Sequence, residues 1–408
     1  MASRTRRSFS QKNLDFRHEG PLGALLADAL AIPAESGYQL THAFHPYPGR
    51  FHPRLPRLVL GAIAMPKQTV LDPFMGGGTT IVEAILHGLH AIGSDLNPVA
   101  LLVARERTRP RSPEEARRVV AEAERIAALV EALRREKRPP RVVRPHLEKL
   151  APEHPPHLFA EMLQVIRLID ALAEGPNRET LRAVFSSLVV KFSNRRSDSS
   201  EEKAPVQYPK GAVSEFLVKK TEELAKAQRT LAERLPRPAP QVRLLEEDAR
   251  LLPALGWGEV DHALTSPPYP GTYDYLEHHE LRLLWLDLPG ESFQARELGP
   301  RREGAAPAAT SWASGMQEAL STLARVIKPE GNLFVVIADW NARGHGVDAA
   351  GQTLRIAGHK GWQCTSRASV QREAFHRAER AAFAKRGKWE HLLHFRRESA
   401  AKSAGGPA

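Results

Sequence analysis

The chain contains 408 residues, of which 58 are Lys or Arg and 47 are Asp or Glu, so its formal net charge is +11. This basic balance favours a polyanionic partner such as a nucleic acid, although positive charge also serves solubility. The only cysteine, Cys364, excludes a disulfide framework and an all-cysteine metal site. The 17 histidines show no metal-ligand spacing, so we expect no bound metal.

The sequence also bears on domain organisation and location. A chain of 408 residues is long enough for one large α/β domain with a sizeable insertion, or for two domains. No apolar run reaches the roughly 18 residues that a membrane-spanning helix needs. The basic residues 2–7 are not followed by the apolar stretch of a secretory signal. We therefore expect a cytoplasmic, nucleoid-associated protein with no membrane partner.

The first predicted region, residues 1–40, is a basic arm followed by a short apolar helix over residues 22–30. The next segment, residues 45–53, is rich in proline and aromatic residues and includes Tyr47 and Phe51. These two rings can close over a ligand, or they can pack as Pro- and aromatic-rich turns do without one.

A glycine-rich loop follows between a predicted strand and a predicted helix. Residues 68–71 are β-prone, residues 81–86 have helical apolar spacing, and Gly76, Gly77 and Gly78 lie between them. Such glycines let a ligand approach the backbone, and the helix N-terminus offers free N–H groups. A second strand, residues 89–95, ends in Asp95, whose carboxylate can accept hydrogen bonds from two ribose hydroxyls. The order of these elements predicts a nucleotide-like cofactor.

Residues 106–236 form a predicted helical insertion with helices at about 112–133, 158–173, 179–191 and 214–234. The proline-rich residues 236–240 then act as a stiff linker back to the core. Within the insertion Lys191, Arg195 and Arg196 are suited to contacts with phosphates, and a solvated loop is the alternative interpretation.

The second informative segment is Thr265-Ser266-Pro267-Pro268-Tyr269, which follows strand-like residues 259–264. Two prolines cannot continue a strand, so the chain must leave the sheet in a stiff turn whose carbonyl groups are free to accept hydrogen bonds. With the Tyr269 ring beside them, these groups can hold a planar heterocycle that carries an exocyclic amine. A loop, or a ligand for a WW-type module, is the structural alternative.

The rest of the chain completes a sheet. Residues 241–244 read as a strand, and a helix is expected around residues 275–286. Residues 327–331 read as a turn into a buried strand at 332–337, and residues 362–365 and 389–395 as closing antiparallel strands. We expect the tail, residues 398–408, to be disordered.

The glycine loop, from Asp72 to Thr80, and the turn from Thr265 to Tyr269 resemble the cofactor and catalytic motifs of S-adenosylmethionine-dependent DNA amino-methyltransferases. Residues 45–53, 95–98 and 247–250 resemble further motifs of that family. The resemblance covers about residues 41–105 and 240–397. It implies an α/β, Rossmann-like methyltransferase fold: a mostly parallel seven-stranded sheet with helices on both faces. Residues 41–105 would then form the cofactor-binding half of the core, and residues 237–397 the catalytic half.

The resemblance, with the residue chemistry above, assigns candidate site residues. The candidate catalytic residues are Ser266, Pro267, Pro268 and Tyr269. The candidate cofactor-binding residues are Tyr47, Phe51, Asp72, Phe74, Gly76, Gly78, Thr79, Asp95, Asn97 and Asp248. The candidate nucleic-acid contacts are Lys191, Arg195, Arg196, Tyr273 and Tyr275. For Asp72 the choice is between binding the cofactor's ammonium group and capping the end of the strand. For Tyr273 and Tyr275 it is between the pocket wall and an ordinary helix start.

The implied reaction is transfer of a methyl group from S-adenosylmethionine to the exocyclic amine of a flipped base in double-stranded DNA. Cytosine N4 is favoured because Ser266 stands where the family's adenine enzymes more often have Asp or Asn. Adenine-N6 methylation of DNA and methylation of an RNA base are the alternative reactions. A non-enzymatic nucleic-acid-binding module is the alternative from another class. The long insertion does not follow the family's commonest ordering, so its role as a recognition region stays open. A cognate restriction endonuclease is a possible partner, and the oligomeric state is not predicted.

Overall fold

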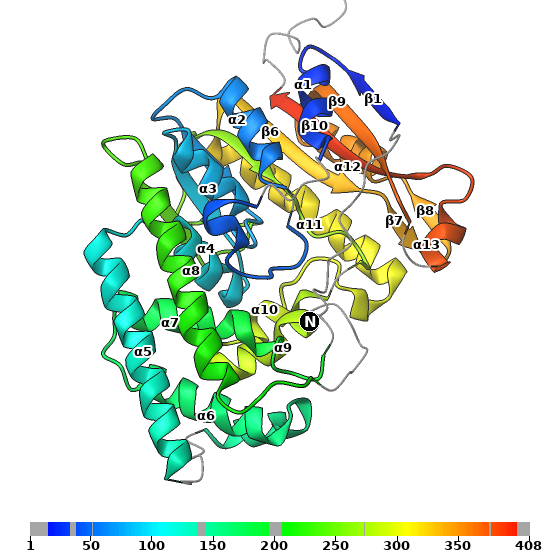
Figure 1. The fold of residues 1–408 in the computed structure, drawn as a ribbon. Helices are drawn as coiled ribbons and strands as arrows, with labels where there is room; N and C mark the ends of the chain where they lie inside the picture. The colour runs from blue at the N-terminus through cyan, green and yellow to red at the C-terminus, as the bar shows by residue number, and fades with distance from the viewer. Residues whose placement is uncertain are drawn as a thin grey trace, which may run out of the picture.

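A central sheet organises the computed structural model, which describes residues 15–32, 38–50, 52–136, 144–195, 206–272, 274–374 and 377–397 (Figure 1). The eight strands of this sheet lie in the order β1-β9-β10-β6-β5-β2-β3-β4. The five strands from β4 to β6 pair in parallel, and β10, β9 and β1 add antiparallel pairs at one side. Their bounds are β1 (Phe16–Glu19), β2 (Thr69–Asp72), β3 (His90–Ser94), β4 (Val242–Leu245), β5 (Val260–Thr265), β6 (Ile327–Ala338), β9 (Trp362–Arg372) and β10 (Lys388–Arg397). The predicted Rossmann-like α/β fold with a mostly parallel sheet is confirmed.

The sheet differs from the prediction in three places. It has eight strands among the described residues and not seven, because β1 adds to the outer edge of β9. The four residues of β1 are all exposed, so no apolar alternation marks them in the sequence. β6 already begins at Ile327, and the polar residues read as a turn form an irregular stretch of that strand, where the register with β5 shifts. β9 extends to Arg372, well beyond the predicted residue 365.

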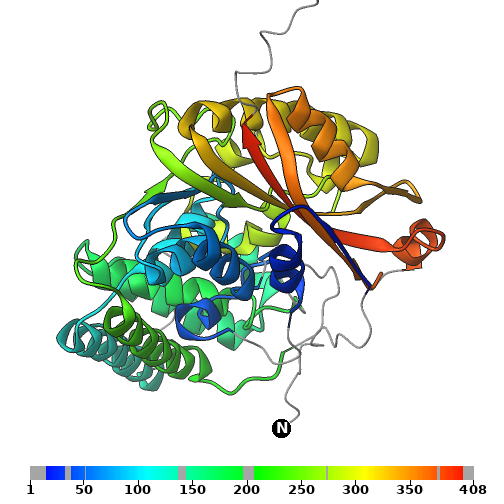
Figure 2. The ribbon, with the colours of Figure 1, turned by 90° about the horizontal axis from the view of Figure 1, so that it is seen from above.

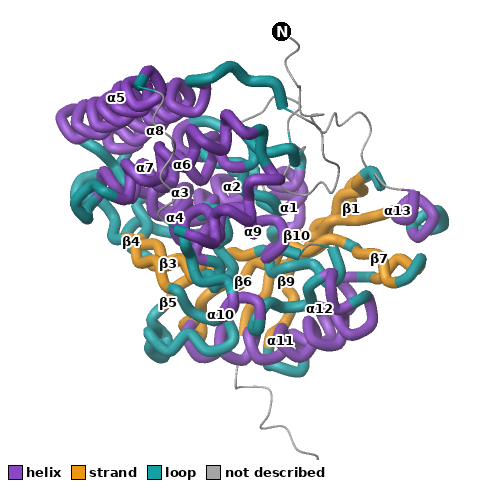
Figure 3. The backbone as a smooth tube through the Cα atoms, turned by 90° about the horizontal axis from the view of Figure 1, so that it is seen from below, coloured by secondary structure: helices purple, strands orange, loops and turns teal. Residues whose placement is uncertain are grey.

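Helices cover both faces of the sheet (Figures 2 and 3). On one face lie α1 (Gly23–Leu30), α2 (Arg54–Ile63), α3 (Thr79–Leu86) and α4 (Pro98–Thr108). On the other lie α11 (Ala305–Val326) and α12 (Ala349–Gly358). Apolar side chains from both layers pack on the sheet, with Leu26 and Val59 on the first face and Trp312 and Ile356 on the second. Burial on both faces is what a parallel sheet requires.

The insertion is helical and has an apolar core of its own. Its helices are α5 (Pro113–Arg135), η2 (Pro145–Glu153), α6 (Pro156–Asp170), α7 (Pro176–Val189) and α8 (Ala212–Arg234). Buried side chains such as Ile126, Met162 and Leu217 form one cluster with Trp285 of α9 (Tyr275–Leu286). The insertion therefore packs against the helix that follows the Pro-Pro turn. The predicted domain boundaries stay predictions.

Short elements complete the described chain. They are η1 (Leu40–Ala43), α10 (Glu291–Gln294), η3 (Arg301–Glu303), the hairpin strands β7 (Trp340–Ala342) and β8 (His345–Val347), and α13 (Arg377–Ala382). Among the described residues no helix is both long and apolar enough to cross a membrane. The predicted location stays a prediction.

Candidate active site

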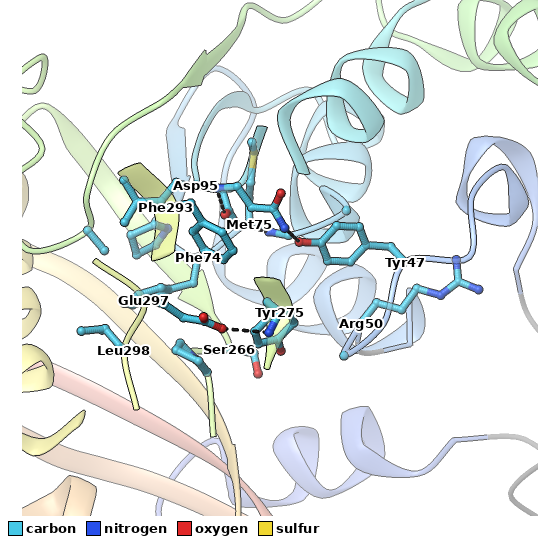
Figure 4. A pocket seen from close by; sticks show the side chains of 18 of the residues that line it. Tyr47, Arg50, Phe74, Met75, Asp95, Ser266, Tyr275, Phe293, Glu297 and Leu298 are labelled. Carbon is cyan, nitrogen blue, oxygen red and sulfur yellow. Dashed lines mark hydrogen bonds between the residues drawn. The ribbon is translucent and has the colours of Figure 1, made fainter. Parts of the chain in front are cut away.

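The two sequence motifs meet at one edge of the sheet. Asp72 of β2 pairs with Gly93 of β3, and Leu71 pairs with Ala263 of β5, so the carboxyl ends of these three parallel strands coincide. Ligands bind at this edge in open α/β sheets. A pocket opens there, with an empty volume of about 860 Å³ that includes open solvent at its mouth (Figure 4).

Residues from seven separated stretches of the chain line this pocket. They are Tyr47, Pro48, Gly49, Arg50, Pro73, Phe74, Met75, Gly76, Gly77, Thr79, Asp95, Leu96, Asn97, Glu247, Asp248, Ala249, Ser266, Pro268, Tyr275, Phe293, Arg296, Glu297 and Leu298. The structure thus brings together most of the predicted cofactor-binding residues with Ser266 and Pro268 of the turn.

The glycine loop is held tightly against its neighbours. Gly76 has a φ of +48°, and a Cβ atom there would lie 3.1 Å from Cε1 of the Tyr47 ring. At Gly77 a Cβ atom would come within 2.5 Å of Nη1 of the buried Arg107. Gly78 does not line the pocket; it has a φ of +75° and lies against Ala104 of α4. Two of these glycines therefore keep backbone at the pocket surface, and the third allows α3 to pack.

Asp95 offers a half-buried carboxylate to the pocket. Its Oδ2 accepts a hydrogen bond from the Gly76 amide at 2.9 Å, and its Oδ1 accepts one from the Asn97 amide at 2.9 Å. Burial raises the pKa of Asp95 to about 6. Each carboxylate oxygen has a second lone pair, so Asp95 can still accept bonds from two ligand hydroxyls.

Asn97 and Tyr47 shape the wall beside Asp95. The Asn97 side chain caps α4 by accepting a hydrogen bond from the Val99 amide at 3.0 Å. Its Nδ2 donates to the Tyr47 hydroxyl at 3.4 Å. Burial, followed by the charge of Asp95, raises the pKa of Tyr47 well above its usual range, so its hydroxyl stays protonated.

Asp72 lies behind the pocket lining. Its Oδ1 accepts hydrogen bonds from the Thr265 hydroxyl at 2.6 Å and from the Phe74 amide at 3.2 Å. Burial raises the pKa of Asp72 to about 6. Asp72 therefore joins the end of β2 to the end of β5, which favours the strand-end role; binding of a cofactor ammonium group stays a prediction.

The Pro-Pro turn is fixed by contacts on its far side. The Trp312 indole N–H donates to the Pro268 carbonyl at 2.8 Å, and the Ser266 and Tyr269 hydroxyls lie 3.3 Å apart. In the part of the chain that the structure describes, no hydrogen bond is made to the Pro267 carbonyl. Pro267 and Tyr269 are not lining residues, and the partly buried Tyr269 ring packs against the core. The predicted stacking of a base on Tyr269 stays a prediction.

Asp248 is tied to a second pocket wall. Arg250 donates from Nε to Oδ1 of Asp248 at 2.9 Å and from Nη2 to Oδ2 at 2.6 Å. The same Nη2 lies 3.4 Å from the Arg296 carbonyl. This pair holds the Asp248 carboxylate, only 5% exposed, in the wall next to residues 293–298.

Sequence reasoning missed that second wall, which comprises Phe293, Arg296, Glu297 and Leu298. Glu297 accepts hydrogen bonds from the Tyr275 amide at 2.8 Å and from Arg302 at 2.5 Å, and burial raises its pKa. The missed lining residues elsewhere include Arg50, Met75 and Glu247. The buried acid Glu297 follows no motif, so the sequence offers no signal that would place it beside Ser266.

The predicted nucleic-acid contacts are spread over different places. Lys191 lies over the rings of Phe216 and Tyr208 at 4.4 and 5.2 Å, and Arg195 forms ion pairs with Glu280 at 3.0 Å and Glu153 at 3.6 Å. Neither cation lines the pocket, whereas Tyr275 does. Phe51, Arg196 and Tyr273 lie outside the described residues.

Comparison with known proteins agrees with this geometry. Residues 14–106, which include the glycine loop and Asp95, match the N6_N4_Mtase family model, described as DNA methylase. The fold and this match relate the chain to the S-adenosylmethionine-dependent DNA amino-methyltransferases, as the two motifs predict, and S-adenosylmethionine is the cofactor of that family.

Two relatives are type II methyltransferases. M.MvaI from Kocuria varians is 26% identical over 267 residues, which cover 61% of this chain and 58% of that protein. M.MjaII from Methanocaldococcus jannaschii is 40% identical over 63 residues, or 15% of this chain and 12% of that protein. The chain thus spans little more than half of the first relative's length and far less of the second's.

Solved structures are more distant. A TehB-like S-adenosylmethionine-dependent methyltransferase from Corynebacterium glutamicum is 9% identical, with a TM-score of 0.30, over 84% of this chain and 87% of that one.

Proposed function

We propose that this protein transfers a methyl group from S-adenosylmethionine to the exocyclic amine of a flipped base in double-stranded DNA, with cytosine N4 as the acceptor atom. One observation carries the proposal: Ser266 of the Pro-Pro turn lines the same pocket as the glycine loop and Asp95. A cofactor held by the glycine loop and a base held by the Pro-Pro turn would therefore lie next to each other.

The residues on the cofactor side suit S-adenosylmethionine. Asp95 would accept hydrogen bonds from the ribose hydroxyls. Gly76 and Gly77 present backbone to the pocket, and a Cβ atom at either would press on Tyr47 or Arg107. Phe74 and Phe293 provide flat apolar walls for an adenine ring, with the Asp248 carboxylate in the same lining. When bound, the cofactor supplies a methyl group on a positively charged sulfur.

The turn would prepare the base for attack. An exocyclic amine is a poor nucleophile because its lone pair is delocalised into the ring. The Ser266 hydroxyl and the Pro267 carbonyl would accept hydrogen bonds from the two N–H groups of the amine and localise that lone pair. Trp312 already occupies the Pro268 carbonyl, which supports Pro267 as the acceptor. Acceptors fixed before the reaction favour catalysis because they need no reorganisation.

Ser266 also supports cytosine over adenine, as the family resemblance implies. The two type II methyltransferases among the relatives support a restriction-modification setting, in which a cognate endonuclease would be the partner.

Nucleoside analysis tests the proposal. Duplex DNA and folded RNA would each be incubated with the protein and S-adenosylmethionine, digested, and examined by mass spectrometry. We expect N4-methylcytosine in DNA only. N6-methyladenine would overturn the choice of base, methylated RNA alone would overturn the choice of DNA, and no product from a protein that binds S-adenosylmethionine would overturn the activity.

A further inference from the structure

A small protrusion stands at the pocket edge of the sheet, on the side away from the helical insertion (Figure 1). It consists of the β7–β8 hairpin and residues 377–386, which include α13 and belong to the β9–β10 connection. We call these two segments the basic platform. We propose that the basic platform binds the phosphate backbone of the DNA duplex whose base enters the pocket, an inference that rests on the proposed function.

The basic platform is a packed unit. The Phe383 side chain, 4% exposed, lies against the hairpin so closely that a Cβ atom on Gly346 would come within 2.5 Å of its ring. Arg386 donates to the Gly346 carbonyl at 3.3 Å and to the buried Asp339 carboxylate at 2.6 Å. Two segments far apart in sequence are thus held together, so the backbone that carries the surface charges has a fixed arrangement.

Exposed charge on the basic platform is mainly positive. The exposed basic side chains are Arg343, Arg377, Arg380, Lys385 and Arg386, and the exposed acidic ones next to them are Asp348 and Glu373. Arg386 is paired with Asp339, and Glu379 is paired with Lys388. For Arg343, Arg377 and Lys385, no acidic group of the described chain lies within ion-pair distance. Cations without an internal partner are available for phosphates.

Strand direction places these cations beside the turn. β5 and β6 are parallel neighbours with Thr265 opposite Val335, so Ser266 and the end of β6 at Ala338 lie at the same edge. The hairpin begins two residues later, at Trp340. The insertion leaves the sheet at the other side, between β3 and β4 (Figures 1 and 3). Pocket-lining residues follow β5, β2 and β3, which lie between β6 and β4 in the sheet order. A duplex centred on the pocket would extend toward the basic platform.

The predicted nucleic-acid contacts on the insertion, Lys191 and Arg195, already have partners within the protein. Arg195 is engaged by Glu153 and Glu280, and the Lys191 ammonium lies over two aromatic rings. Breaking such contacts would offset part of the gain from a new phosphate contact. The basic platform carries no such cost for Arg343, Arg377 and Lys385.

Salt-dependent binding tests the inference. The triple variant Arg343→Gln, Arg377→Gln, Lys385→Gln would be compared with the parent. Binding to a fluorescent mixed-sequence duplex would be measured between about 50 and 200 mM salt. Each phosphate contact releases about 0.9 counterions and contributes that amount to the slope. We expect affinity to fall by about tenfold or more and the log–log salt slope to lose about 2 to 3 units. S-adenosylmethionine affinity should not change.

The control removes the same charge from the opposite edge of the sheet, with Lys67→Gln, Arg355→Gln and Lys360→Gln. This control should keep the parent slope. If the two triple variants behave alike while the parent binds and methylates DNA, the basic platform is not the contact surface and the proposed function stands. If the parent methylates RNA and not DNA, the proposed function fails first, and the basic platform falls with it.

Discussion

The two walls of the pocket are built in different ways. The centre of the cofactor wall comes from one continuous stretch, residues 73–97, in which the Gly76 amide, Asp95 and Asn97 are joined by short hydrogen bonds. The base wall combines residues 266–275 with Glu297 and is held by side-chain contacts such as Trp312 to Pro268 and Glu297 to Tyr275. A single substitution in the cofactor wall should therefore impair cofactor binding as a whole. Substitutions in the base wall should instead affect capture of the base and methyl transfer separately.

Gly76→Val should have the largest effect, loss of measurable S-adenosylmethionine binding. Gly76 has a φ of +48°, and its Cβ position lies 3.1 Å from the Tyr47 ring, so a branched side chain strains the loop and fills the ligand's space. Calorimetry would measure affinity, and circular dichroism would check folding. Gly358→Ala, at a glycine with no atom within 4 Å of its Cβ position, is the control. Unchanged affinity in Gly76→Val would remove the loop from the site.

Asp95→Ala should weaken S-adenosylmethionine binding by about 1.5–3 kcal/mol, the range for hydrogen bonds to a charged group. The variant also frees the Gly76 and Asn97 amides, so its melting temperature should be measured alongside. Glu215→Ala on α8 is the matched control at an exposed acid. A loss of only a few-fold would mean that Asp95 organises the loop without touching the cofactor.

Tyr269→Ala should weaken capture of the flipped base by roughly 1–3 kcal/mol, the range for a stacked base. Tyr269→Phe keeps the ring and removes the hydroxyl that lies 3.3 Å from Ser266 Oγ. The two variants therefore separate stacking from the positioning of Ser266. If the Ala variant binds a duplex with an unpaired target base as the parent does, Tyr269 packs only against the core.

The pH dependence of cofactor binding should follow the ionisation of Asp95. Burial raises its pKa to about 6, and the ionised form is the one that accepts two hydroxyls. Affinity should be constant above about pH 7, halve near pH 6 and fall by up to tenfold per unit below it. Asp72 also has a pKa of about 6, so the comparison is with Asp95→Asn, which keeps Asp72. An equal slope in that variant would assign the titration to another group.

Local motifs explain why the cofactor wall could be predicted from the sequence. Strand, glycine turn, helix and acid follow each other within residues 68–95, and parallel pairing then fixes their positions. Glu297 and Phe293 could not be predicted, because only the tertiary fold brings them to Ser266. β1 and the β7–β8 hairpin are short and largely exposed or half-buried, so they carry no apolar alternation. The residues at the start of β6 are polar and include Pro329, so the sequence predicts a turn there. In the structure they form an irregular stretch of the strand.

Single-turnover methylation by Ser266→Ala tests the central claim most directly. Parent and variant, each saturated with labelled S-adenosylmethionine, would be mixed in excess with a cytosine-containing duplex, and Ser321→Ala on the exposed face of α11 would serve as the control. We expect unchanged cofactor affinity and methyl transfer slower by about a hundredfold, as for the loss of one group that stabilises a transition state. Transfer at the parent rate would contradict the assignment and reduce the Thr265 to Tyr269 segment to a structural turn.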